Sequence, residues 1–542
     1  MEHKVVMEDT KCTLYSSYVK ACKDRLDMPA VFINESKELF TSGEILSFAD
    51  AASAGLSSIG LGLGTRVGIM LNATVEEAVV LLALSKIGAV CKYIDFMKSP
   101  MAIKDNIVSS KLDYLVVDID SFDVGPFSDD ESFPPVIAIT GKETLNERFK
   151  NWKDIIKAEN TAIEATPYIN DKAAVVINSS GTTGAPKPIV HTDLSINSAV
   201  RKMEDTDFPI ESGNVIIKNI PSCVGLGLIT SLYTGLITGS VVVLMKARDI
   251  NGVIDELSDF VGNFAFFKNE CGLNPDAKLN IFSTPLFIGG MIQSEKTTDL
   301  SCIGSMLAAG SKMTKESLEV LNGVAKQKGC AVPICNGYGQ NEMAGAVALN
   351  CNCANRNGSA GIPTVGTEVI VVDLDNHKKI SNNEIGLVLE KSDSCFKEYE
   401  NMPELTSKAW MKLDDGTMWF NTNDLGYFDN DGYLNITGRL SRVAIRADFK
   451  ISLDEVERKL KKIDCIEDCA VIVPKAGGSM EEIIAFVKTE ETTEEIMEHI
   501  NKSNLFSEFD MPSRLVSIAE IPYRGVGKVD YMALEKEANS SR

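Results

Sequence analysis

Strand-like and helix-like segments alternate through the first half of this sequence, and that alternation restricts the fold more than any other feature. Residues 67–71 and 89–94 are short apolar runs, and residues 75–87 between them carry apolar side chains at helical spacing. A helix between two strands lets the strands run parallel, so repeated units of this kind build parallel sheets covered by helices on both faces. The sequence therefore predicts an α/β fold.

The second half of the chain has a different pattern. Residues 358–434 contain shorter strand-like runs and more turns, which predicts an antiparallel β module. Beyond residue 438, an amphipathic helix is expected at 453–463, a strand at 469–473 and a helix at 494–502. The last hundred residues are therefore expected to form a small, separate α+β domain.

Charge and cysteine usage exclude several classes of protein. The 542 residues include 54 Lys and Arg against 76 Asp and Glu, a net charge of −22, which disfavours nucleic acid and anionic membrane surfaces as partners. The 13 cysteines show no paired C-x-x-C spacing, so reduced thiols are favoured over structural zinc. The N-terminus lacks an apolar signal-peptide core, and we expect a cytoplasmic protein.

Residues 220–245 carry no charged side chain and are long enough to span a bilayer. Pro221 and four glycines interrupt this stretch, and the β-branched run 240–244 is typical of a buried strand. We therefore interpret it as a helix, a turn and a buried strand within a large core, not as a membrane span.

A loop rich in small and hydroxyl side chains follows an apolar strand at 175–178. Glycines let the backbone aim N–H groups at an anion, hydroxyls add neutral donors, and a lysine adds charge, so the loop indicates a polyphosphate site. A flexible turn is the alternative. The spacing differs from G-x-x-x-x-G-K-[ST]. The residues that would bind phosphate are Ser179, Ser180, Gly181, Thr182, Thr183, Gly184 and Lys187.

The segment 179–187, Ser-Ser-Gly-Thr-Thr-Gly-Ala-Pro-Lys, closely resembles the signature loop of adenylate-forming enzymes. That superfamily holds acyl- and aryl-CoA synthetases, peptide-synthetase adenylation domains and beetle luciferases. Other segments resemble the family's motifs in the family's order and cover most of the chain, at 84–95, 308–311, 336–342, 358–366, 420–424, 432–434, 438–439 and 522–528. The chain is identified as a member of this superfamily on that series.

The resemblance implies a fold and a reaction. It implies a large N-terminal AMP-binding domain over 1–437, with parallel helix-covered sheets and a β-barrel-like subdomain, and a small mobile C-terminal lid domain over 438–542. A carboxylate would attack the α-phosphorus of ATP and expel pyrophosphate, and a thiol would then displace AMP from the acyl-adenylate. The implied cofactors are ATP, Mg²⁺ and CoA, or the phosphopantetheine of a carrier protein.

The same resemblance assigns roles to individual residues. Lys528 would bridge the carboxylate and the α-phosphate, Glu342 would hold Mg²⁺, and Asn341, where the family has Thr, would donate to a phosphate. Asp424 would accept the ribose hydroxyls, and Arg439 would add charge near the ribose or phosphate. Tyr338 would stack on adenine, Asn336 would contact its amino edge, and the loop beside adenine would contain Ala309, Gly310 and Ser311. His191 is as readily a core or surface residue as a catalytic one.

Departures from the family pattern concern the acid and the acceptor. Val224 and Gly225 align with a segment that lines the acyl pocket, and the chain has no acidic residue between 211 and 249. Because a buried ammonium without a carboxylate partner is costly, an α-amino acid is disfavoured as substrate. Ser441 stands at the hinge. Asp448 stands where CoA-forming members have a tunnel glycine, and its charge disfavours a nearby thiolate.

Three functions remain open from the sequence. The first is an ATP-dependent acid–CoA ligase for an acyl or aryl acid, and the second is a stand-alone adenylating enzyme that loads a carrier protein. The third is a nucleotide-binding protein that has lost catalysis. The joint presence of Lys187, Glu342, Asp424 and Lys528 argues against the third.

Overall fold

The computed structural model describes residues 9–125, 130–141, 149–157, 162–179, 187–311, 313–446, 449–474, 482–503, 505–507, 510–524 and 528–540. The chain folds as two compact units. The first contains the described residues up to 179, residues 187–368 and residues 392–408. The second contains residues 369–391 and the described residues from 409 onward.

An eight-stranded sheet forms one part of the first unit, with the strand order β19-β9-β8-β4-β3-β5-β6-β7. Its strands from β8 to β7 run parallel, whereas β9 and β19 are antiparallel additions at one edge. The bounds are β3 Arg66–Met70, β4 Val90–Tyr93, β5 Tyr114–Asp118, β6 Val136–Ile139, β7 Phe149–Asn151, β8 Ala173–Asn178, β9 Pro188–Thr192 and β19 Glu398–Tyr399.

A nine-stranded sheet forms the other part, with the order β16-β15-β14-β13-β12-β10-β11-β1-β2. Its central strands, from β14 to β1, are parallel, and β2, β15 and β16 pair antiparallel at the two edges. The bounds are β1 Pro29–Ile33, β2 Glu38–Thr41, β10 Val215–Lys218, β11 Val241–Leu244, β12 Leu279–Ser283, β13 Ile303–Ala308, β14 Ile334–Gln340, β15 Gly345–Leu349 and β16 Ile362–Pro363. The predicted α/β class with parallel sheets is confirmed.

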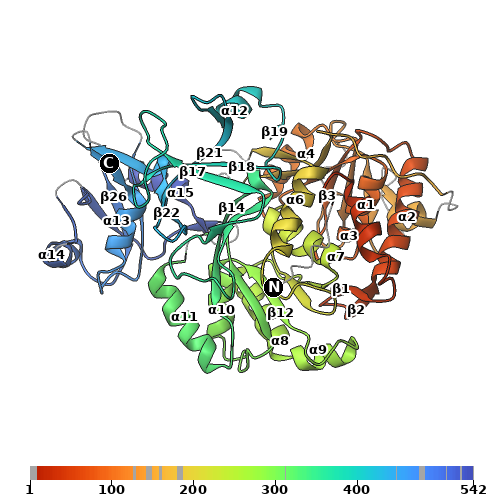
Figure 1. Ribbon diagram of the computed structural model, residues 1–542, viewed down its shortest axis with the longest axis horizontal. Coiled ribbons are helices and arrows are strands. Elements are labelled where there is room, and N and C mark those ends of the chain that lie inside the picture. The colour runs from red at the N-terminus through yellow and green to blue at the C-terminus, as the bar shows by residue number, and fades with distance from the viewer. Residues whose placement is uncertain are drawn as a thin grey trace. The chain divides into compact units, whose positions relative to one another are not determined.

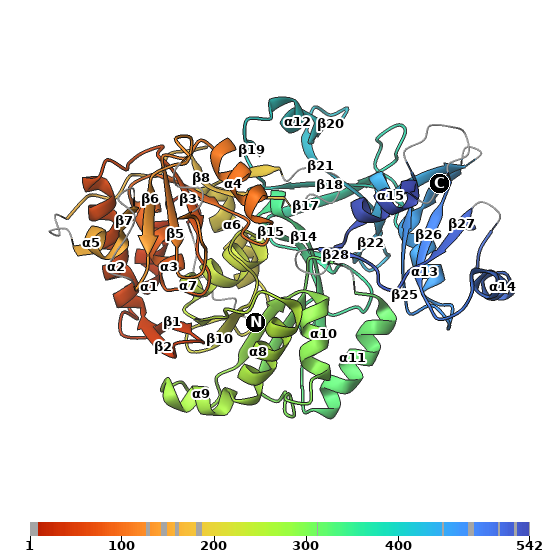
Figure 2. The ribbon, with the colours of Figure 1, turned by 180° about the vertical axis from the view of Figure 1, so that it is seen from behind.

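Helices cover these sheets and bury their apolar strands. The helices α8, α10 and α11 lie side by side (Figures 1 and 2), and their apolar side chains share one core with β10, β12 and β13. The helical bounds are α1 Leu14–Cys22, α2 Ser42–Ser58, α3 Glu76–Lys86, α4 Pro100–Ser109, α5 Trp152–Lys157, α6 Asp193–Glu204, η2 Leu226–Tyr233, α7 Thr234–Thr238, α8 Ile250–Gly262, α9 Phe264–Glu270, α10 Pro285–Gln293, α11 Lys315–Gln327, η3 Asn341–Met343 and α12 Pro403–Lys408.

The uncharged stretch 220–245 folds as the sequence predicts. It forms a π-helix, η2, then the short helix α7, a turn at Gly239 with φ of 86°, and the buried strand β11. The π-helix and the strand bury their apolar side chains in the first unit. Within the described residues, no helix is long and apolar enough to cross a membrane.

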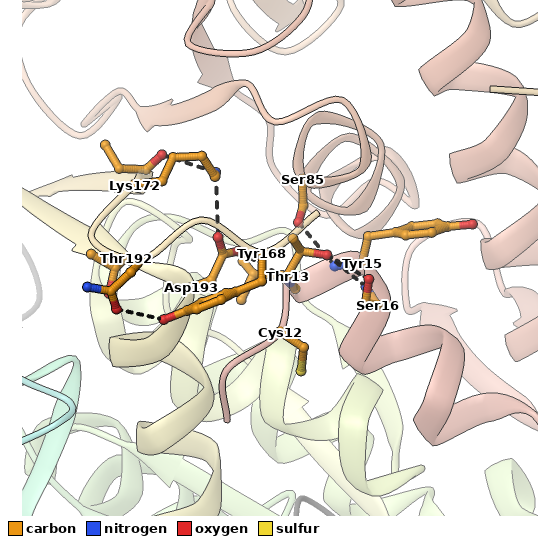
Figure 3. A network of polar contacts seen from close by, with 12 residues as sticks. Cys12, Thr13, Tyr15, Ser16, Ser85, Tyr168, Lys172, Thr192 and Asp193 are labelled. Carbon is orange, nitrogen blue, oxygen red and sulfur yellow. Dashed lines mark hydrogen bonds and ion pairs between the residues drawn. The ribbon is translucent and has the colours of Figure 1, made fainter. Parts of the chain in front are cut away.

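A polar network ties α1 to the start of α6, immediately after β9 (Figure 3). The Asp193 carboxylate accepts a hydrogen bond from Leu14 N at 3.1 Å and lies 3.5 Å from Lys172 Nζ. Burial raises the pKa of Asp193. Ser85 Oγ accepts from Tyr15 N at 3.1 Å. A carboxylate at a helix N-terminus is favoured by the helix dipole, so these contacts fix the chain where β9 becomes α6.

An antiparallel sheet of the second unit corresponds to the β module expected over 358–434. Its strand order is β17-β18-β21-β20, with β22 paired to β21. The bounds are β17 Thr367–Val372, β18 Gly386–Ser392, β20 Trp410–Lys412, β21 Met418–Phe428 and β22 Leu434–Arg439. The structure groups this sheet with the C-terminal elements in one compact unit.

The rest of the second unit is the expected α+β arrangement. The sheet β25-β26-β27 buries alternate residues on its two faces, one against α13 and α14 and the other against α15. The bounds are η4 Leu440–Arg442, β23 Val443–Arg446, β24 Phe449–Ser452, α13 Leu453–Leu460, β25 Asp468–Ile472, β26 Ile484–Lys488, α14 Thr493–Ser503, β27 Arg514–Ser517, β28 Tyr523–Arg524, β29 Lys528–Val529 and α15 Tyr531–Ser540.

Candidate active site

The candidate phosphate loop connects two antiparallel strands, β8 and β9, at their paired ends. Ser179 N donates to Lys187 O at 2.8 Å, and Lys187 N donates to Ser179 Oγ at 3.0 Å. These two bonds close the base of the loop, so the structure brings together its first and last predicted residues. The predicted residues Ser180, Gly181, Thr182, Thr183 and Gly184 lie outside the described part of the chain.

Lys187 and Glu342 meet at a tyrosine that the sequence analysis missed. The Tyr399 hydroxyl donates to Glu342 Oε1 at 2.9 Å, and Lys187 Nζ lies 5.3 Å from the centre of the Tyr399 ring. Tyr399 belongs to β19, which pairs with β9 directly after Lys187. Burial, together with the neighbouring Glu342 carboxylate, raises the pKa of Tyr399 and keeps its hydroxyl a donor. No motif marked this residue; only strand pairing reveals it.

The Glu342 side chain fits the hard, oxygen-rich coordination that Mg²⁺ prefers. One carboxylate oxygen, Oε1, is held by Tyr399, whereas Oε2 accepts no hydrogen bond from the described residues. The residue sits in the 3₁₀ turn η3 and is only partly buried. Its backbone oxygen accepts from Phe396 N at 2.6 Å, which fixes the turn. Glu342 is therefore oriented and able to take a cation on one oxygen.

Asn341 connects three segments of the candidate site. Its Nδ2 donates to Asn178 O at 3.0 Å, at the base of the phosphate loop, and its Oδ1 accepts from Gly225 N at 3.3 Å. A Cβ at Gly225 would lie 3.1 Å from that Oδ1, so a glycine there permits the close approach. Val224, next to Gly225, is partly buried. The segment predicted to line the acyl pocket therefore lies beside the phosphate-loop base.

His191 is a buried structural residue of β9 that supports the same turn. Its Nε2 donates to Asn341 O at 2.8 Å, and its Nδ1 lies 3.1 Å from Ser195 Oγ. The ring is fully shielded from solvent, and that burial lowers its pKa from 6.5 to about 4, against a smaller opposing effect of the Asn341 carbonyl. The sequence left open whether His191 is a core or surface residue or a catalytic one, and this buried environment favours a core role.

The free energy of unfolding is expected to decrease at acidic pH because of His191. Below about pH 6.5 the unfolded chain binds a proton on this residue, whereas the folded chain stays neutral down to about pH 4. The free energy of unfolding should therefore fall by up to about 3 kcal/mol between about pH 7 and pH 4. Urea unfolding at several pH values measures this slope. His191→Gln should flatten it and His377→Gln, at an exposed position, should not; an unchanged slope in His191→Gln would contradict the assignment.

The residues predicted to surround adenine lie at the carboxyl ends of β12 and β13 and on the adjacent strand β14. Asn336 on β14 pairs with Ala308 at the end of β13, and Ala309 N donates to Ser283 O at the end of β12. This edge of a parallel sheet is where ligands bind in open α/β folds. Gly310 has φ of 86°, a conformation that glycine adopts readily, and Ser311 is exposed.

The two predicted side chains of β14 differ in their surroundings. Asn336 is buried, and its Nδ2 donates to Met313 O and Ser359 O at 3.3 and 3.5 Å. Its amide donors are thus used within the protein, which leaves Oδ1 as the atom suited to an adenine amino group. The partly buried Tyr338 accepts a hydrogen bond from Gln340 Nε2 at 3.0 Å, which fixes the end of its side chain.

A fully buried ion pair lies below the acyl-pocket segment, and the sequence analysis did not find it. Lys218 Nζ, at the end of β10, is 2.9 Å from Glu77 Oε2 on α3, with 2% and 0% of the side chains exposed. The Ser222 hydroxyl donates to the same carboxylate, and Ala73 N donates to Oε1 at 2.7 Å. The two residues are 141 positions apart in the chain, so no local sequence pattern predicts that they pair.

Asp424 and Arg439 are brought together in the second unit. They face each other on β21 and β22, and Arg439 Nε lies 3.0 Å from Asp424 Oδ1. Asp424 is buried, and its N–H donates to Thr422 Oγ1 at 2.9 Å. The preceding Asn423 has φ of 56°. Asparagine tolerates this left-handed conformation better than most residues other than glycine.

The remaining predicted residues also lie in the second unit. Ser441 is exposed in η4, and Arg442 beside it bonds Asp454 and Glu457 and stacks 4.0 Å from the Tyr531 ring. Lys528 begins β29 and pairs with Arg524 in a short hairpin. Asp448 lies outside the described residues.

Comparison with known proteins identifies the family of this chain. Residues 19–400 match the family described as AMP-binding enzyme. A 4-coumarate–CoA ligase of Humulus lupulus is 26% identical over 507 residues, covering 90% of this chain and 88% of that protein.

Two solved structures share the fold. An anthranilate CoA ligase in complex with anthranoyl-AMP gives a TM-score of 0.81 at 19% identity, covering 99% of this chain and 100% of that one. An O-succinylbenzoate coenzyme A synthetase from Bacillus subtilis, in complex with ATP and Mg²⁺, gives 0.77 at 18% identity, covering 97% and 99%. With the family match spanning most of its length, the chain belongs to the AMP-binding enzyme family, as the resemblance of its motifs to adenylate-forming enzymes predicted.

Proposed function

We propose that this protein is an AMP-forming acid–thiol ligase that activates a carboxylic acid with ATP and transfers the acyl group to CoA. The observation that carries the proposal is the meeting of Lys187, Tyr399 and Glu342 beside the base of the phosphate loop, in a chain of this family. A cation and an oriented carboxylate beside the base of a glycine-rich loop suit a nucleoside triphosphate with its metal ion.

In the first half-reaction, the carboxylate oxygen of the acid bonds to the α-phosphorus of ATP, and the bond to pyrophosphate breaks. Lys187 and the loop would hold the phosphates, and Glu342 would hold Mg²⁺, which supplies positive charge to the phosphate oxygens when it is bound. Asp424 would accept the ribose hydroxyls, with Arg439 orienting its carboxylate. Lys528 would contact the carboxylate and the α-phosphate. Catalysis of this kind relies on positioning and charge.

In the second half-reaction, a thiolate bonds to the acyl carbon and AMP leaves. We propose CoA as the acceptor, because the relatives with known acceptors are CoA ligases. A carrier-protein phosphopantetheine offers the same thiol. We also propose a cytoplasmic location, which the thirteen free cysteines support.

The acid is proposed to lack an α-ammonium group. Two carboxylates lie against the segment 221–225. Asp95 Oδ1 accepts from Cys223 Sγ at 3.8 Å and from Met97 N at 3.1 Å, and Asp95 Oδ2 lies 3.7 Å from Lys98 Nζ. The other carboxylate is that of Glu77, which Lys218 and Ser222 already occupy. Releasing it to pair with a substrate ammonium would leave Lys218 buried without a partner, and such a break costs several kcal/mol. The relatives named for coumarate and anthranilate agree with an aliphatic or aromatic acid.

Acid-dependent exchange between ATP and labelled pyrophosphate tests the first half-reaction. A panel of aliphatic, aromatic and α-amino acids should give exchange with one or more acids of the first two groups and none with the third. AMP release with CoA, compared with release with a phosphopantetheinylated carrier protein, identifies the acceptor. Absence of exchange with every acid, despite ATP binding, would instead support a nucleotide-binding protein without catalysis.

Substitution of Ser441 tests the proposed division into domains 1–437 and 438–542. If the C-terminal part rotates about this exposed residue between half-reactions, Ser441→Pro, which fixes φ, should block thioester formation and spare pyrophosphate exchange. We expect thioester formation to fall at least about a hundredfold and pyrophosphate exchange to fall less than about threefold, because a hinge substitution affects the step that needs the rotation. Ser441→Ala is the matched control. An equal loss of both half-reactions in Ser441→Pro would contradict the rotation.

A further inference from the structure

Three side chains of types that bind metal ions converge in the second unit, and none of them belongs to a residue proposed to act on ATP or the acid. They are Cys465, between α13 and β25, Glu491, between β26 and α14, and His499 on α14. One potential ligand atom from each lies within 4.8 Å of the others. No other cluster of three such groups occurs among the residues that the structure describes.

The fold holds all three residues in place. Thr489 Oγ1 donates to Cys465 O at 2.7 Å and accepts from Glu491 N at 3.1 Å, so one hydroxyl ties the two backbone segments together. Helix α14 buries Ile496 and Ile500, on either side of His499 in the sequence, in the core against one face of the sheet β25-β26-β27. The three side chains are therefore presented by a packed framework.

The contact between Glu491 and His499 has the geometry of two ligands that share an ion. Glu491 Oε2 lies 3.3 Å from His499 Nε2, yet this oxygen is shielded from solvent and has no hydrogen-bond partner among the described residues. In a tetrahedral zinc site, with ligand distances of about 2.0–2.1 Å, an oxygen and a nitrogen ligand stand about 3.3 Å apart. The two atoms thus have the separation of ligands and lack the alignment of a hydrogen bond.

We propose that Cys465, Glu491 and His499 bind one Zn²⁺ ion, with the fourth tetrahedral position taken by water. Sulfur, imidazole nitrogen and carboxylate oxygen are the three ligand types that Zn²⁺ uses in proteins, whereas Mg²⁺ takes oxygen ligands almost exclusively. Two further acidic residues, Asp464 and Glu495, lie close enough to act electrostatically on Cys465 and His499 and favour a cation. Bound metal would tie the start of β25 to α14.

Cobalt titration tests this site on the full chain, stripped of metal and carrying no histidine tag. Co²⁺ is added in the presence of excess Mg²⁺, and the thiolate-to-cobalt charge-transfer absorption is followed. We expect one Co²⁺ per chain, displaced by one equivalent of Zn²⁺. Cys465→Ser should abolish the absorption, and His499→Gln or Glu491→Gln should weaken binding by at least about tenfold.

The controls use a cysteine and a histidine that are exposed elsewhere. Cys353→Ser and His377→Gln should leave the stoichiometry, affinity and absorption unchanged. Circular dichroism checks that each variant is folded. Absence of a thiolate band in the unsubstituted chain, or an unchanged band and affinity in Cys465→Ser/His499→Gln, would overturn the proposal. Because no ATP or acid is present, the result is independent of the proposed ligase activity.

Discussion

Glu342→Ala is expected to lower kcat/KM for acid-dependent pyrophosphate exchange by about 10²–10³-fold, which corresponds to about 3–4 kcal/mol of transition-state stabilisation. The substitution removes the carboxylate that we propose to hold Mg²⁺ against the phosphate oxygens. Tyr399, which is hydrogen-bonded to that carboxylate, offers only a hydroxyl and cannot replace its charge. The loss should appear in kcat/KM measured over a series of Mg²⁺ concentrations.

Tyr399→Phe is the matched control for this experiment. It removes the hydrogen bond to Glu342 Oε1 while keeping the carboxylate and the ring beside Lys187. A neutral donor to a charged acceptor contributes about 1.5–3 kcal/mol at most, so the loss should be smaller than that of Glu342→Ala. Full exchange activity of Glu342→Ala at every Mg²⁺ concentration would remove Glu342 from the proposed mechanism.

Lys218→Met is expected to destabilise the first unit by about 3–5 kcal/mol. The side chains have similar lengths, so the main effect is electrostatic: Glu77 stays fully buried and loses its cation at 2.9 Å. The hydrogen bonds from Ser222 and Ala73 would remain but cannot neutralise the charge. Urea unfolding followed by circular dichroism measures the change.

Two further variants separate this effect from simple loss of packing. Glu77→Gln/Lys218→Met removes both charges and should recover most of the lost stability. Lys502→Met breaks an exposed pair, with Lys502 Nζ 3.0 Å from Glu498, and should cost less than about 1 kcal/mol. If the double variant were as unstable as Lys218→Met, the buried charge would not be the cause.

The fold could be predicted from the sequence where the local pattern of apolar residues matches the side chains that the structure buries. The runs at 67–71 and 89–94 became β3 and β4, and the helical pattern between them became α3, because their apolar side chains are almost all buried. The grouping of the antiparallel sheet with the C-terminal elements could not be predicted, because it depends on contacts between segments and not on any one segment.

The site was predictable only as a set of residues. Motif order named Lys187, Glu342, Asp424 and Arg439, and the structure brings these together in two pairs, one in each unit. Tyr399, which contacts both Lys187 and Glu342, carried no signal because the paired residues of β19 and β9 are 208 and 210 positions apart along the chain. Likewise, the absence of C-x-x-C pairs argued against zinc, whereas Cys465, Glu491 and His499 converge through the packing of α14.

By itself, then, the sequence determined the α/β class, the order of the motifs and the family, because these depend on residue type and local spacing. The tertiary structure decided which groups meet: His191 with Asn341, Glu77 with Lys218, and Tyr399 with Glu342. Each of these pairs joins residues 57 to 150 positions apart, and their distance is set by strand register and helix packing. The charge and burial that follow from such contacts are properties of the folded chain alone.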